Sequence, residues 1–493
     1  MAKQKSMTAR CVMVLGTSSG AGKSWLAAAL CRWWANAGLC VRPFKAQNMS
    51  NNARVAPAPG GGWGEMGAAQ YFQALAARCA PDVRMNPVLL KPEADTRSQV
   101  VLMGQVNAAL TALPWAQRGA HCWPHIQRAL DELRAECDVL VIEGAGSPAE
   151  INLMPRDVVN LRVARHAQAR CLLVADIDRG GAFAHLYGTW ALLPPADRAL
   201  LVGFVLNKFR GDAALLAPAP QRLHEMTGVP VLATLPMLRA HGLPEEDGVF
   251  DAAPCVPDAA GGAPLRVAIV GWPHISNLDE FQPLKSCVHL TWARDAAALA
   301  AADIIILPGS KAVAADVAWL RAQGMDAALA AHAARGARVL GICGGAQALG
   351  AVLDDPHGVE GGGVPHCVPG LELLALHTTL APEKRVQPGR WRLREVRALW
   401  SALADVDVQG YEIRAGRTAP TDESAVHTLL PGLAWQNAAG NVLGLSMHGL
   451  FENAAALRAL FGAQAPSLDA ALDSLAAVVG EAFGDAALQR LIS

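Results

Sequence analysis

The chain has 493 residues, of which 52% are hydrophobic and 17% charged, and its formal net charge is −1. This length and composition predict a globular protein of about two or three domains. The near-zero charge gives no electrostatic argument for nucleic acid or a membrane surface as a partner, and no apolar run approaches the ~18–20 residues that cross a bilayer. The eleven cysteines include no Cys-x-x-Cys pair, which argues against a zinc ribbon or a thioredoxin-like motif. Their number is odd and a long chain with a good core has little need of disulfides, so we expect a reduced, cytoplasmic protein.

Short apolar runs alternate with helical stretches along the whole chain. Continuous apolar runs are typical of parallel strands that are covered on both faces. The predicted fold class is therefore α/β and doubly wound. We expect strands at Cys11–Leu15, Val139–Ile142, Leu172–Ala175, Leu201–Leu206, Val267–Val270, Ile304–Leu307 and Val339–Ile342.

Two stretches rich in Ala, Pro and Gly interrupt this pattern. Residues 54–64 predict a mobile surface loop, and residues 251–264 predict an interdomain linker. We therefore expect one domain over residues 8–250, a second over 265–460, and a helical tail over 461–493. Apolar residues at helical spacing make the tail a packing helix without chemistry of its own; they are Leu468, Leu472, Leu475 and Val479.

A glycine-rich loop follows the first strand, and a helix is expected from Trp25. Backbone N–H groups of such a loop can surround phosphate, while a lysine neutralises the β/γ oxygens and a hydroxyl binds Mg²⁺. The spacing departs from the common P-loop because Thr17 holds the usual first-glycine position. A turn without a ligand is the alternative. The predicted nucleotide-binding residues are Gly16, Thr17, Gly20, Gly22, Lys23 and Ser24.

Two further polar positions follow strands in the N-terminal half. Glu143 ends the strand over 139–142, where a carboxylate is well placed to hold Mg²⁺ together with Ser24. Lys45 lies in an amide-rich segment, 43–52, and we expect it to contact phosphate or a substrate carboxylate. Solvated loop residues are the alternative interpretation of both.

In the C-terminal half, a strand runs into a cysteine turn. The apolar run over 339–342 leads into Cys343, Gly344 and Gly345, and an Ala/Leu-rich segment follows. A turn at a helix N-terminus exposes the thiol and favours the thiolate. Because the thiolate is the nucleophile, this pattern predicts covalent catalysis. A small cysteine in the core is the alternative.

Two other segments supply what a nucleophilic cysteine needs. An apolar strand delivers His448, a base that is far from Cys343 in sequence, as such partners usually are. The strand over 304–307 runs into Gly309, whose backbone N–H could stabilise a developing oxyanion. The backbone N–H of Gly344 is the expected second donor.

The motifs Gly-Ile-Cys-Gly-Gly (341–345), Leu-Pro-Gly-Ser-Lys (307–311) and His-Gly-Leu-Phe-Glu-Asn (448–453) resemble the class I glutamine amidotransferase domain of the cobyrinate-amidating enzymes. The resemblance implies that Cys343 attacks the side-chain amide of L-glutamine, that ammonia leaves, and that a glutamyl thioester is hydrolysed, with His448 as the base. Many class I glutaminases carry a Glu two residues after this His, but here Leu450 stands there. Glu452 is a candidate for orienting His448, and another acid remains open.

The N-terminal loop resembles that of dethiobiotin synthetases. Taken in order from about Cys11 to Asn453, the motifs resemble the cobyric acid synthase branch of the cobyrinate-amidating family. Lys-Ala-Gln-Asn-Met-Ser favours this branch over the a,c-diamide synthases. The other motifs that carry the resemblance are Asn-Pro-Val-Leu-Leu-Lys-Pro (86–92), Glu-Gly-Ala-Gly-Ser-Pro (143–148), Asp-Ile-Asp-Arg-Gly-Gly (176–181) and Asn-Lys-Phe-Arg-Gly-Asp (207–212).

The resemblance implies an enzyme of cobalamin biosynthesis that uses ATP, Mg²⁺ and L-glutamine. Its implied corrinoid substrate is adenosylcobyrinate a,c-diamide, amidated at the b, d, e and g side chains to adenosylcobyric acid. Candidate corrinoid contacts are Gln47, Asn48, Asp176, Asp178 and Arg179. The alternatives are an a,c-diamide synthase and a P-loop switch ATPase with an inactive glutaminase-like domain. The ammonia route, the order of amidations and the oligomeric state, including a homo-oligomer, stay open.

Four positions depart from the family pattern. Ala346 stands in place of an aromatic residue, Ala312 in place of Asn, His274 in place of Arg, and Arg414 in place of His. Because Cys343 and His448 fit the pattern, we expect the activity to be kept. The departures bear on how glutamine binds and how the domains communicate.

Overall fold

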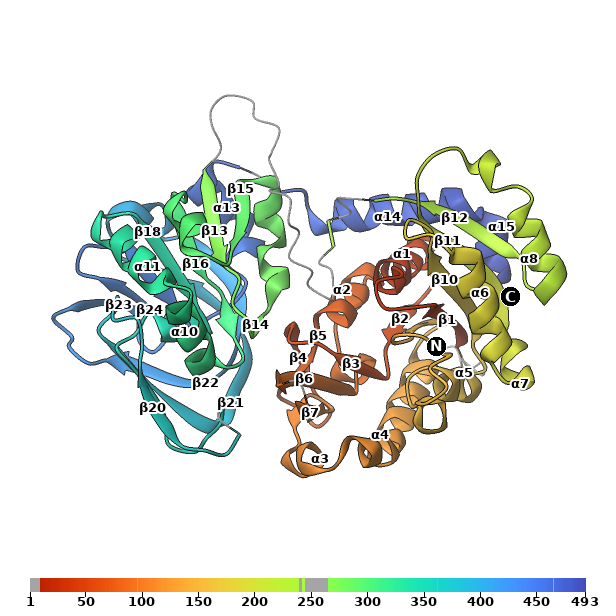
Figure 1. Ribbon diagram of the computed structural model, residues 1–493, viewed down its shortest axis with the longest axis horizontal. Helices are drawn as coiled ribbons and strands as arrows, with labels where there is room; N and C mark the ends of the chain where they lie inside the picture. Colours follow the sequence, from red (N-terminus) through yellow and green to blue (C-terminus); the bar gives the residue numbers. More distant parts are fainter. Residues whose placement is uncertain (1–8, 95, 239–241, 244–264, 361, 464) are drawn as a thin grey trace, which may run out of the picture.

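The computed structural model describes residues 9–94, 96–238, 242–243, 265–360, 362–463 and 465–493. The chain forms two lobes that lie side by side, each built around a twisted sheet (Figure 1). The expected linker over 251–264 lies outside the described residues, and the domain limits given above remain predictions. Both sheets contain the strands expected from the apolar runs, so the doubly wound α/β class is confirmed.

The sheet of the first lobe is wholly parallel, in the order β12-β11-β10-β1-β9-β2. Its central strand is the first strand of the chain, so the loop that follows β1 lies in the middle of the carboxyl edge. The strands are β1 (Arg10–Gly16), β2 (Val41–Phe44), β9 (Val139–Glu143), β10 (Arg170–Asp176), β11 (Leu201–Phe209) and β12 (Val231–Pro236).

Helices cover both faces of this sheet because alternate side chains of each buried strand point to opposite sides. Met13 and Leu15 pack in one apolar cluster with α4 and α6. Val12 and Val14 pack in the other with α1 and with α14 (Leu468–Phe483). The helices of this lobe are α1 (Lys23–Asn36), α2 (Ala68–Ala76), α3 (Ala108–Ala112), α4 (Trp115–Glu136), α5 (Leu161–Ala167), α6 (Ala182–Leu192), α7 (Pro195–Arg198) and α8 (Ala219–Thr227).

The second lobe holds a seven-stranded sheet in the order β15-β13-β16-β18-β25-β24-β23. The first five strands are parallel, and β24 and β23 add an antiparallel edge. The strands are β13 (Arg266–Val270), β15 (His289–Ala293), β16 (Ile304–Leu307), β18 (Arg338–Ile342), β23 (Val426–Leu430), β24 (Ala434–Asn437) and β25 (Val442–Leu445). The helices are α9 (Ala296–Ala300), α10 (Val313–Ala322), α11 (Met325–Ala334), α12 (Gly344–Ala348) and α13 (Ala454–Phe461).

Small sheets of both lobes meet between the two large ones (Figure 1). In the second lobe a long hairpin of β21 (Leu376–Arg392) and β22 (Asp407–Pro420) joins β19 (Val352–Asp355) and β20 (His366–Pro369), and β14 (Ile275–Ser276) pairs with β17 (Gly309–Ser310). The first lobe contributes a sheet of β3 (Gln47–Met49), β6 (Val88–Ala94), β7 (Arg97–Leu102) and β8 (Gln105–Val106).

The prediction of a mobile loop over 54–64 is wrong. Residues 53–67 form an antiparallel hairpin of β4 (Ala53–Pro57) and β5 (Trp63–Gly67), which packs against β21 and β22 of the second lobe. Gly60, Gly61 and Gly62 have positive φ angles and form only the turn. Arg54 is 2% exposed. The Ala, Pro and Gly content suggested an exposed loop, but contacts with the other lobe bury part of this segment.

The C-terminal tail returns to the first lobe as α14 (Leu468–Phe483) and α15 (Asp485–Arg490) (Figure 1). Leu472, Leu475 and Val479 join the core cluster on the α1 side of the sheet. A buried arginine of α1, Arg32, binds the Asp469 carboxylate of α14 at 2.6 Å. The tail therefore closes one face of the lobe that begins the chain.

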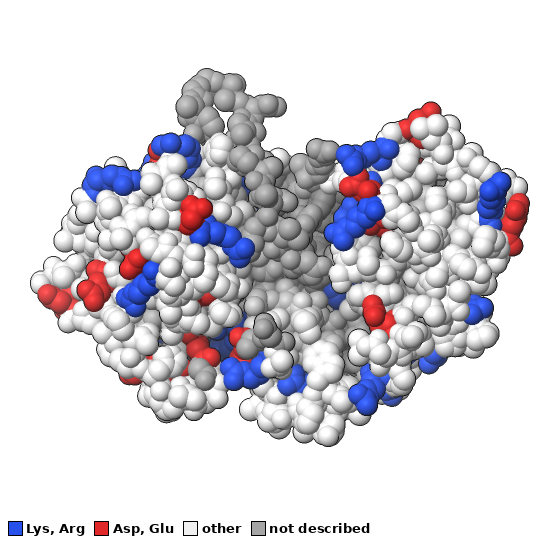
Figure 2. Space-filling view, in the orientation of Figure 1, with Lys and Arg blue, Asp and Glu red and all other residues white. Residues whose placement is uncertain are grey.

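None of the helices in the described part of the chain has the length and apolar character that a bilayer crossing requires. Lysine and arginine side chains are interspersed with acidic ones on the face that Figure 2 shows, and uncharged residues cover most of it. This mixture agrees with the formal net charge of −1.

We expect Leu472→Ala to destabilise the first lobe by about 3 kcal/mol, because it removes a fully buried side chain of α14 and leaves a cavity against α1. The urea midpoint of unfolding measures the effect. Leu215→Ala is the control, since Leu215 is 81% exposed. Equal midpoints for the two variants would contradict the packing role of the tail.

Candidate active sites

The glycine-rich loop joins β1 to α1 at the carboxyl edge of the first sheet. Helix α1 begins at Lys23, two residues before the expected Trp25. Gly22 has a φ of 97°, and a Cβ there would lie 2.0 Å from Asn207 Nδ2. Asn207, at the end of β11, donates a hydrogen bond to Ala21 O at 2.8 Å. The shape of the loop therefore requires glycine at position 22.

Lys23 connects this loop to the segment that follows β9. Its Nζ donates to Ser18 O at 3.0 Å and to Gly146 O at 3.2 Å. The ammonium group thus lies over the concave side of the loop, between two backbone segments. This is where a lysine can neutralise phosphate oxygens once they replace the carbonyl contacts.

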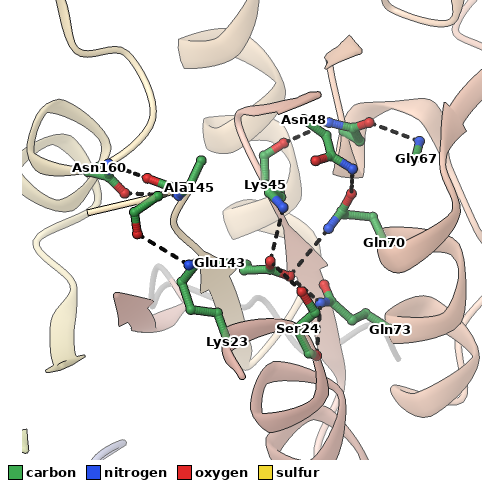
Figure 3. Close-up of polar contacts among 12 residues, drawn as sticks. Lys23, Ser24, Lys45, Asn48, Gly67, Gln70, Gln73, Glu143, Ala145 and Asn160 are labelled. Carbon is green, nitrogen blue, oxygen red and sulfur yellow. Dashed lines mark hydrogen bonds and ion pairs between the residues drawn. The ribbon is translucent and has the colours of Figure 1, made fainter. Parts of the chain in front are cut away.

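Glu143 is the centre of a buried polar cluster (Figure 3). Its Oε1 accepts hydrogen bonds from Ser24 Oγ at 2.8 Å and Lys45 Nζ at 3.0 Å. Its Oε2 accepts one from Gln73 Nε2 at 2.5 Å and a longer one from Gln70 Nε2 at 3.4 Å. Burial alone would raise the pKa of Glu143, but Lys45 and the other donors lower it below its usual value. The side chain is therefore an ionised carboxylate.

The Ser24 hydroxyl and the Glu143 carboxylate fit Mg²⁺, which prefers oxygen ligands. Within the part of the chain that the structure describes, no three His, Cys, Asp or Glu side chains could hold a metal ion by themselves. A Mg²⁺ ion here would take its remaining ligands from phosphate and water, which is the usual arrangement for this ion.

The candidate corrinoid contacts lie in two places. Asp176 ends β10, and Asp178 and Arg179 follow it, at the same carboxyl edge as the phosphate loop. Asp176 binds Lys208 Nζ at 3.1 Å, and the side chain of Arg179 is 73% exposed. Gln47 and Asn48 lie on β3. Asn48 is buried and donates to Gln70 Oε1 at 3.2 Å (Figure 3). Because Gln70 in turn donates to Glu143, Asn48 helps to orient a member of the Glu143 cluster.

Cys343 occupies a strained turn in the second lobe. Its φ and ψ are 50° and −107°, a backbone conformation that is costly for a residue with a side chain. The turn follows β18 and precedes α12. A Cβ on Gly344 would lie 2.6 Å from Ser310 N, and one on Gly309 would lie 3.1 Å from His448 Cε1. The structure therefore brings together all four residues that the sequence predicted for this site.

His448 has a carboxylate partner that is distant in sequence. Its Nδ1 lies 2.8 Å from Glu280 Oε1, and the Gly449 N–H donates to Glu280 Oε2 at 3.0 Å. Glu280 lies in the 3₁₀ helix η4 (Leu278–Ser286) and is fully buried. The ring of Tyr411 stacks on the imidazole, with centroids 5.2 Å apart. Contact through Nδ1 leaves Nε2 for the thiol.

The surroundings of His448 favour the imidazolium. Burial lowers its pKa, but the Glu280 carboxylate and the contact with Cys343 outweigh burial and raise the pKa to about 10. A protonated imidazole beside a thiol stabilises the thiolate. The arrangement can therefore supply both a nucleophile and a proton donor.

Two family models together match nearly the whole chain. A CobQ/CobB/MinD/ParA nucleotide binding domain matches residues 12–247, and a CobB/CobQ-like glutamine amidotransferase domain matches residues 266–456. A cobyric acid synthase of Paracidovorax citrulli is 68% identical over 97% of this chain and 98% of its own. Those of Acidovorax sp. (strain JS42) and Variovorax paradoxus are each 64% identical, over 100% and 99% of this chain and 99% and 100% of their own.

The chain belongs to the cobyric acid synthase family. It is a glutamine-dependent amidotransferase of cobalamin biosynthesis, with a nucleotide-binding lobe and a glutaminase lobe. The nucleotide-binding model covers the glycine-rich loop and Glu143, and the amidotransferase model covers Cys343, Glu280 and His448. The roles of the single residues in both sites stay predictions.

Sequence reasoning missed Glu280, which lies 168 residues before its partner His448. The candidate it named, Glu452, binds Arg54 Nη2 at 2.5 Å instead. One signal was present. Asp279 and Glu280 stand directly between the apolar residues Leu278 and Phe281. Two adjacent acids between apolar residues can indicate carboxylates that are buried for a purpose.

The four departures from the family pattern have local partners. His274 contacts Asp316, with Nδ1 2.9 Å from Oδ1, and Arg414 donates to Glu412 Oε2 at 2.7 Å. Ala312 donates its N–H to Ser310 Oγ at 3.0 Å. Ala346 is buried beside Gly444 of β25. None of these contacts replaces a group of the Cys343–His448–Glu280 set.

We expect Gly22→Ala to weaken MgATP binding at least ~10-fold, because the new Cβ meets Asn207 and the positive φ is strained. Titration calorimetry measures the affinity. Gly38→Ala is the matched control: its φ is 84° and no atom lies within 4 Å of an added Cβ. Wild-type affinity in Gly22→Ala would show that the loop does not bind the nucleotide.

We expect Glu280→Gln to lower the His448 pKa toward its usual value of ~6.5, since the carboxylate that raises it is gone. In the wild type the raised pKa keeps His448 protonated up to about pH 10. In the variant the imidazole is mostly neutral above pH ~6.5, so the positive charge that stabilises the Cys343 thiolate is lost. Alkylation of Cys343 by iodoacetamide at pH 8 should slow at least ~10-fold, and glutamine hydrolysis should fall ~100-fold.

Glu395→Gln is the control for this substitution, because the Glu395 side chain is 78% exposed. Glu452→Gln is compared with Glu280→Gln because the sequence named Glu452 as a candidate for orienting His448. If Glu452→Gln slowed alkylation and Glu280→Gln did not, the orienting role would belong to Glu452.

Proposed function

We propose that the protein converts adenosylcobyrinate a,c-diamide to adenosylcobyric acid by amidating the b, d, e and g carboxylates, with ATP as activator and L-glutamine as nitrogen donor. The observation that carries this proposal is the presence of two complementary sites in one chain. The first combines Lys23, Ser24 and Glu143 at a glycine-rich loop. The second combines Cys343, His448 and Glu280. Amidation of a carboxylate needs both an activated acyl group and unprotonated ammonia.

In the glutaminase site, the Cys343 thiolate attacks the side-chain carbonyl carbon of glutamine. The N–H groups of Gly309 and Gly344 donate to the oxyanion, and the His448 imidazolium gives its proton to the leaving ammonia. Glu280 holds the ring and stabilises its charge. Neutral His448 then takes a proton from water, which hydrolyses the glutamyl thioester and returns the thiolate.

In the synthetase site, a side-chain carboxylate of the corrinoid attacks the γ-phosphorus of ATP, giving an acyl phosphate and ADP. Lys23 and the loop N–H groups stabilise the transferring phosphoryl group. Mg²⁺ bound by Ser24 and Glu143 would neutralise phosphate oxygens. Lys45, which binds Glu143, would contact the phosphate or the side-chain carboxylate of the substrate. Ammonia then attacks the acyl carbon, and inorganic phosphate leaves.

The choice of substrate is supported by the names of the relatives and by the Lys-Ala-Gln-Asn-Met-Ser segment over 45–50. Gln47, Asn48, Asp176, Asp178 and Arg179 are the proposed corrinoid contacts. The proposal includes domain limits of 8–250 and 265–460. It also includes a cytoplasmic location, since none of the described cysteines forms a disulfide.

A coupled assay tests this function with adenosylcobyrinate a,c-diamide, MgATP and glutamine, followed by mass spectrometry. We expect four successive mass decreases of about one unit each, because each step exchanges OH for NH₂. Cys343→Ala should abolish the change with glutamine and retain it with ammonium chloride, since ammonia bypasses the thiol. No mass change on this acceptor in the wild type, with glutamine hydrolysis intact, would overturn the substrate assignment.

A further inference from the structure

Arg54 crosses from one lobe to the other as a buried charge. It lies on β4 of the first lobe, and its side chain is 2% exposed. Its Nε donates to Asp279 Oδ2 at 2.7 Å, and its Nη2 contacts both Asp279 and Glu452. The two carboxylates belong to the second lobe. The guanidinium also lies over three aromatic rings, at 5.6 Å from Tyr71, 5.0 Å from Phe72 and 5.0 Å from Tyr411.

The residues next to Arg54 also bond to the residues next to Asp279. The Leu278 N–H donates to Asn52 Oδ1 at 2.9 Å, and Asn277 Nδ2 donates to Ala53 O at 3.0 Å. Residues 52–54 of one lobe and 277–279 of the other, called here the interlobe contact, therefore meet at three points. Together these contacts hold the two segments against each other.

The interlobe contact ends beside the two groups that hold His448. Glu280, the carboxylate partner of the ring, follows Asp279 directly. Tyr411, which stacks on the ring, accepts a hydrogen bond from Asn277 Nδ2 at 2.7 Å. Both the edge and the face of the imidazole are thus positioned by residues that the first lobe holds in place.

Arg54 also neutralises Asp279, a carboxylate that would otherwise be buried without an ionic partner among the described residues. Asp279, Glu280 and Glu452 bring three carboxylates close to one another, and burial raises the pKa of Asp279 despite the neighbouring guanidinium. Removing one partner of a buried pair leaves an uncompensated charge, which is more damaging than removing both. The segment 277–280 would relax toward water or toward another partner, and Glu280 would move with it.

We propose that Arg54 of the nucleotide-binding lobe is a positioning residue for the glutaminase site: by binding Asp279 and Glu452 it fixes the segment 277–280, and through it Glu280 and Tyr411, against His448. This inference rests on the proposed function of Cys343 and His448. Its consequence is that glutamine is hydrolysed efficiently only while the two lobes are docked, so ammonia is released where the acceptor lobe is present.

The test uses the full-length protein and follows glutamate release from glutamine, which needs no corrinoid. We expect Arg54→Met to lower kcat ~100-fold and to change KM for glutamine less than ~3-fold, because the substrate pocket remains while the imidazole is misplaced. Arg54→Lys, which keeps the charge but loses the fork, should retain intermediate activity. MgATP affinity should stay within ~3-fold of wild type in both variants, since the glycine-rich loop is untouched.

A double variant separates positioning from general damage. Arg54→Met with Asp279→Asn removes the fully buried carboxylate and leaves only Glu452, whose side chain is 34% exposed, without Arg54, so we expect it to recover at least ~10-fold in kcat over Arg54→Met alone. Arg392→Met is the matched control, because Arg392 pairs with Asp407 on the surface of the same hairpin that carries Tyr411. It should keep wild-type kcat.

Two outcomes overturn the inference. Glutamine hydrolysis within ~3-fold of wild type in Arg54→Met would show that the residue does not position the site. An equal loss of MgATP affinity would assign it to the first lobe. Absence of corrinoid amidation by the wild type, with glutamate release intact, would instead overturn the proposed substrate and leave this inference standing.

Discussion

The carboxyl ends of the parallel strands are the constraint on which both sites depend. Strands that run in one direction end at one edge, where their last backbone groups are unpaired and the following residues converge. In the first lobe β1 ends at the phosphate loop and β9 ends at Glu143. In the second, β18 ends at Cys343, and β25 leads to His448. Groups from distant parts of the sequence thus meet without long loops to hold them.

Local patterns sufficed to predict central strands of the two large sheets, the glycine-rich loop and the cysteine turn. Each is encoded by a run of neighbouring residues, as in the apolar run before Cys343. Partners that meet only through tertiary contacts could not be found in this way. Glu280 reaches His448 from a different strand connection. Arg54 lies in a stretch of Ala, Pro and Gly that would form a loop if it did not pack on the other lobe.

The same limit applies to the tail. Its apolar spacing predicts a packing helix, but periodicity does not identify the surface that the helix covers. The structure shows α14 on α1, with Leu472 and Leu475 in the core of the first lobe. Arg32 of α1 explains the pairing chemically, because a fully buried guanidinium needs the carboxylate of Asp469. In the sequence, the second lobe therefore lies between α1 and α14, two helices that pack together in the first lobe.

The contact between the lobes includes several buried polar pairs. Besides Arg54, Lys384 binds Glu65 at 3.0 Å and Gln99 at 2.7 Å across the lobes. Buried ion pairs add little net stability, because desolvation offsets most of their attraction, but they penalise every wrong register. At residues 52–54 and 277–279, two hydrogen bonds and the Arg54–Asp279 pair therefore suit an accurate alignment of the lobes beside His448.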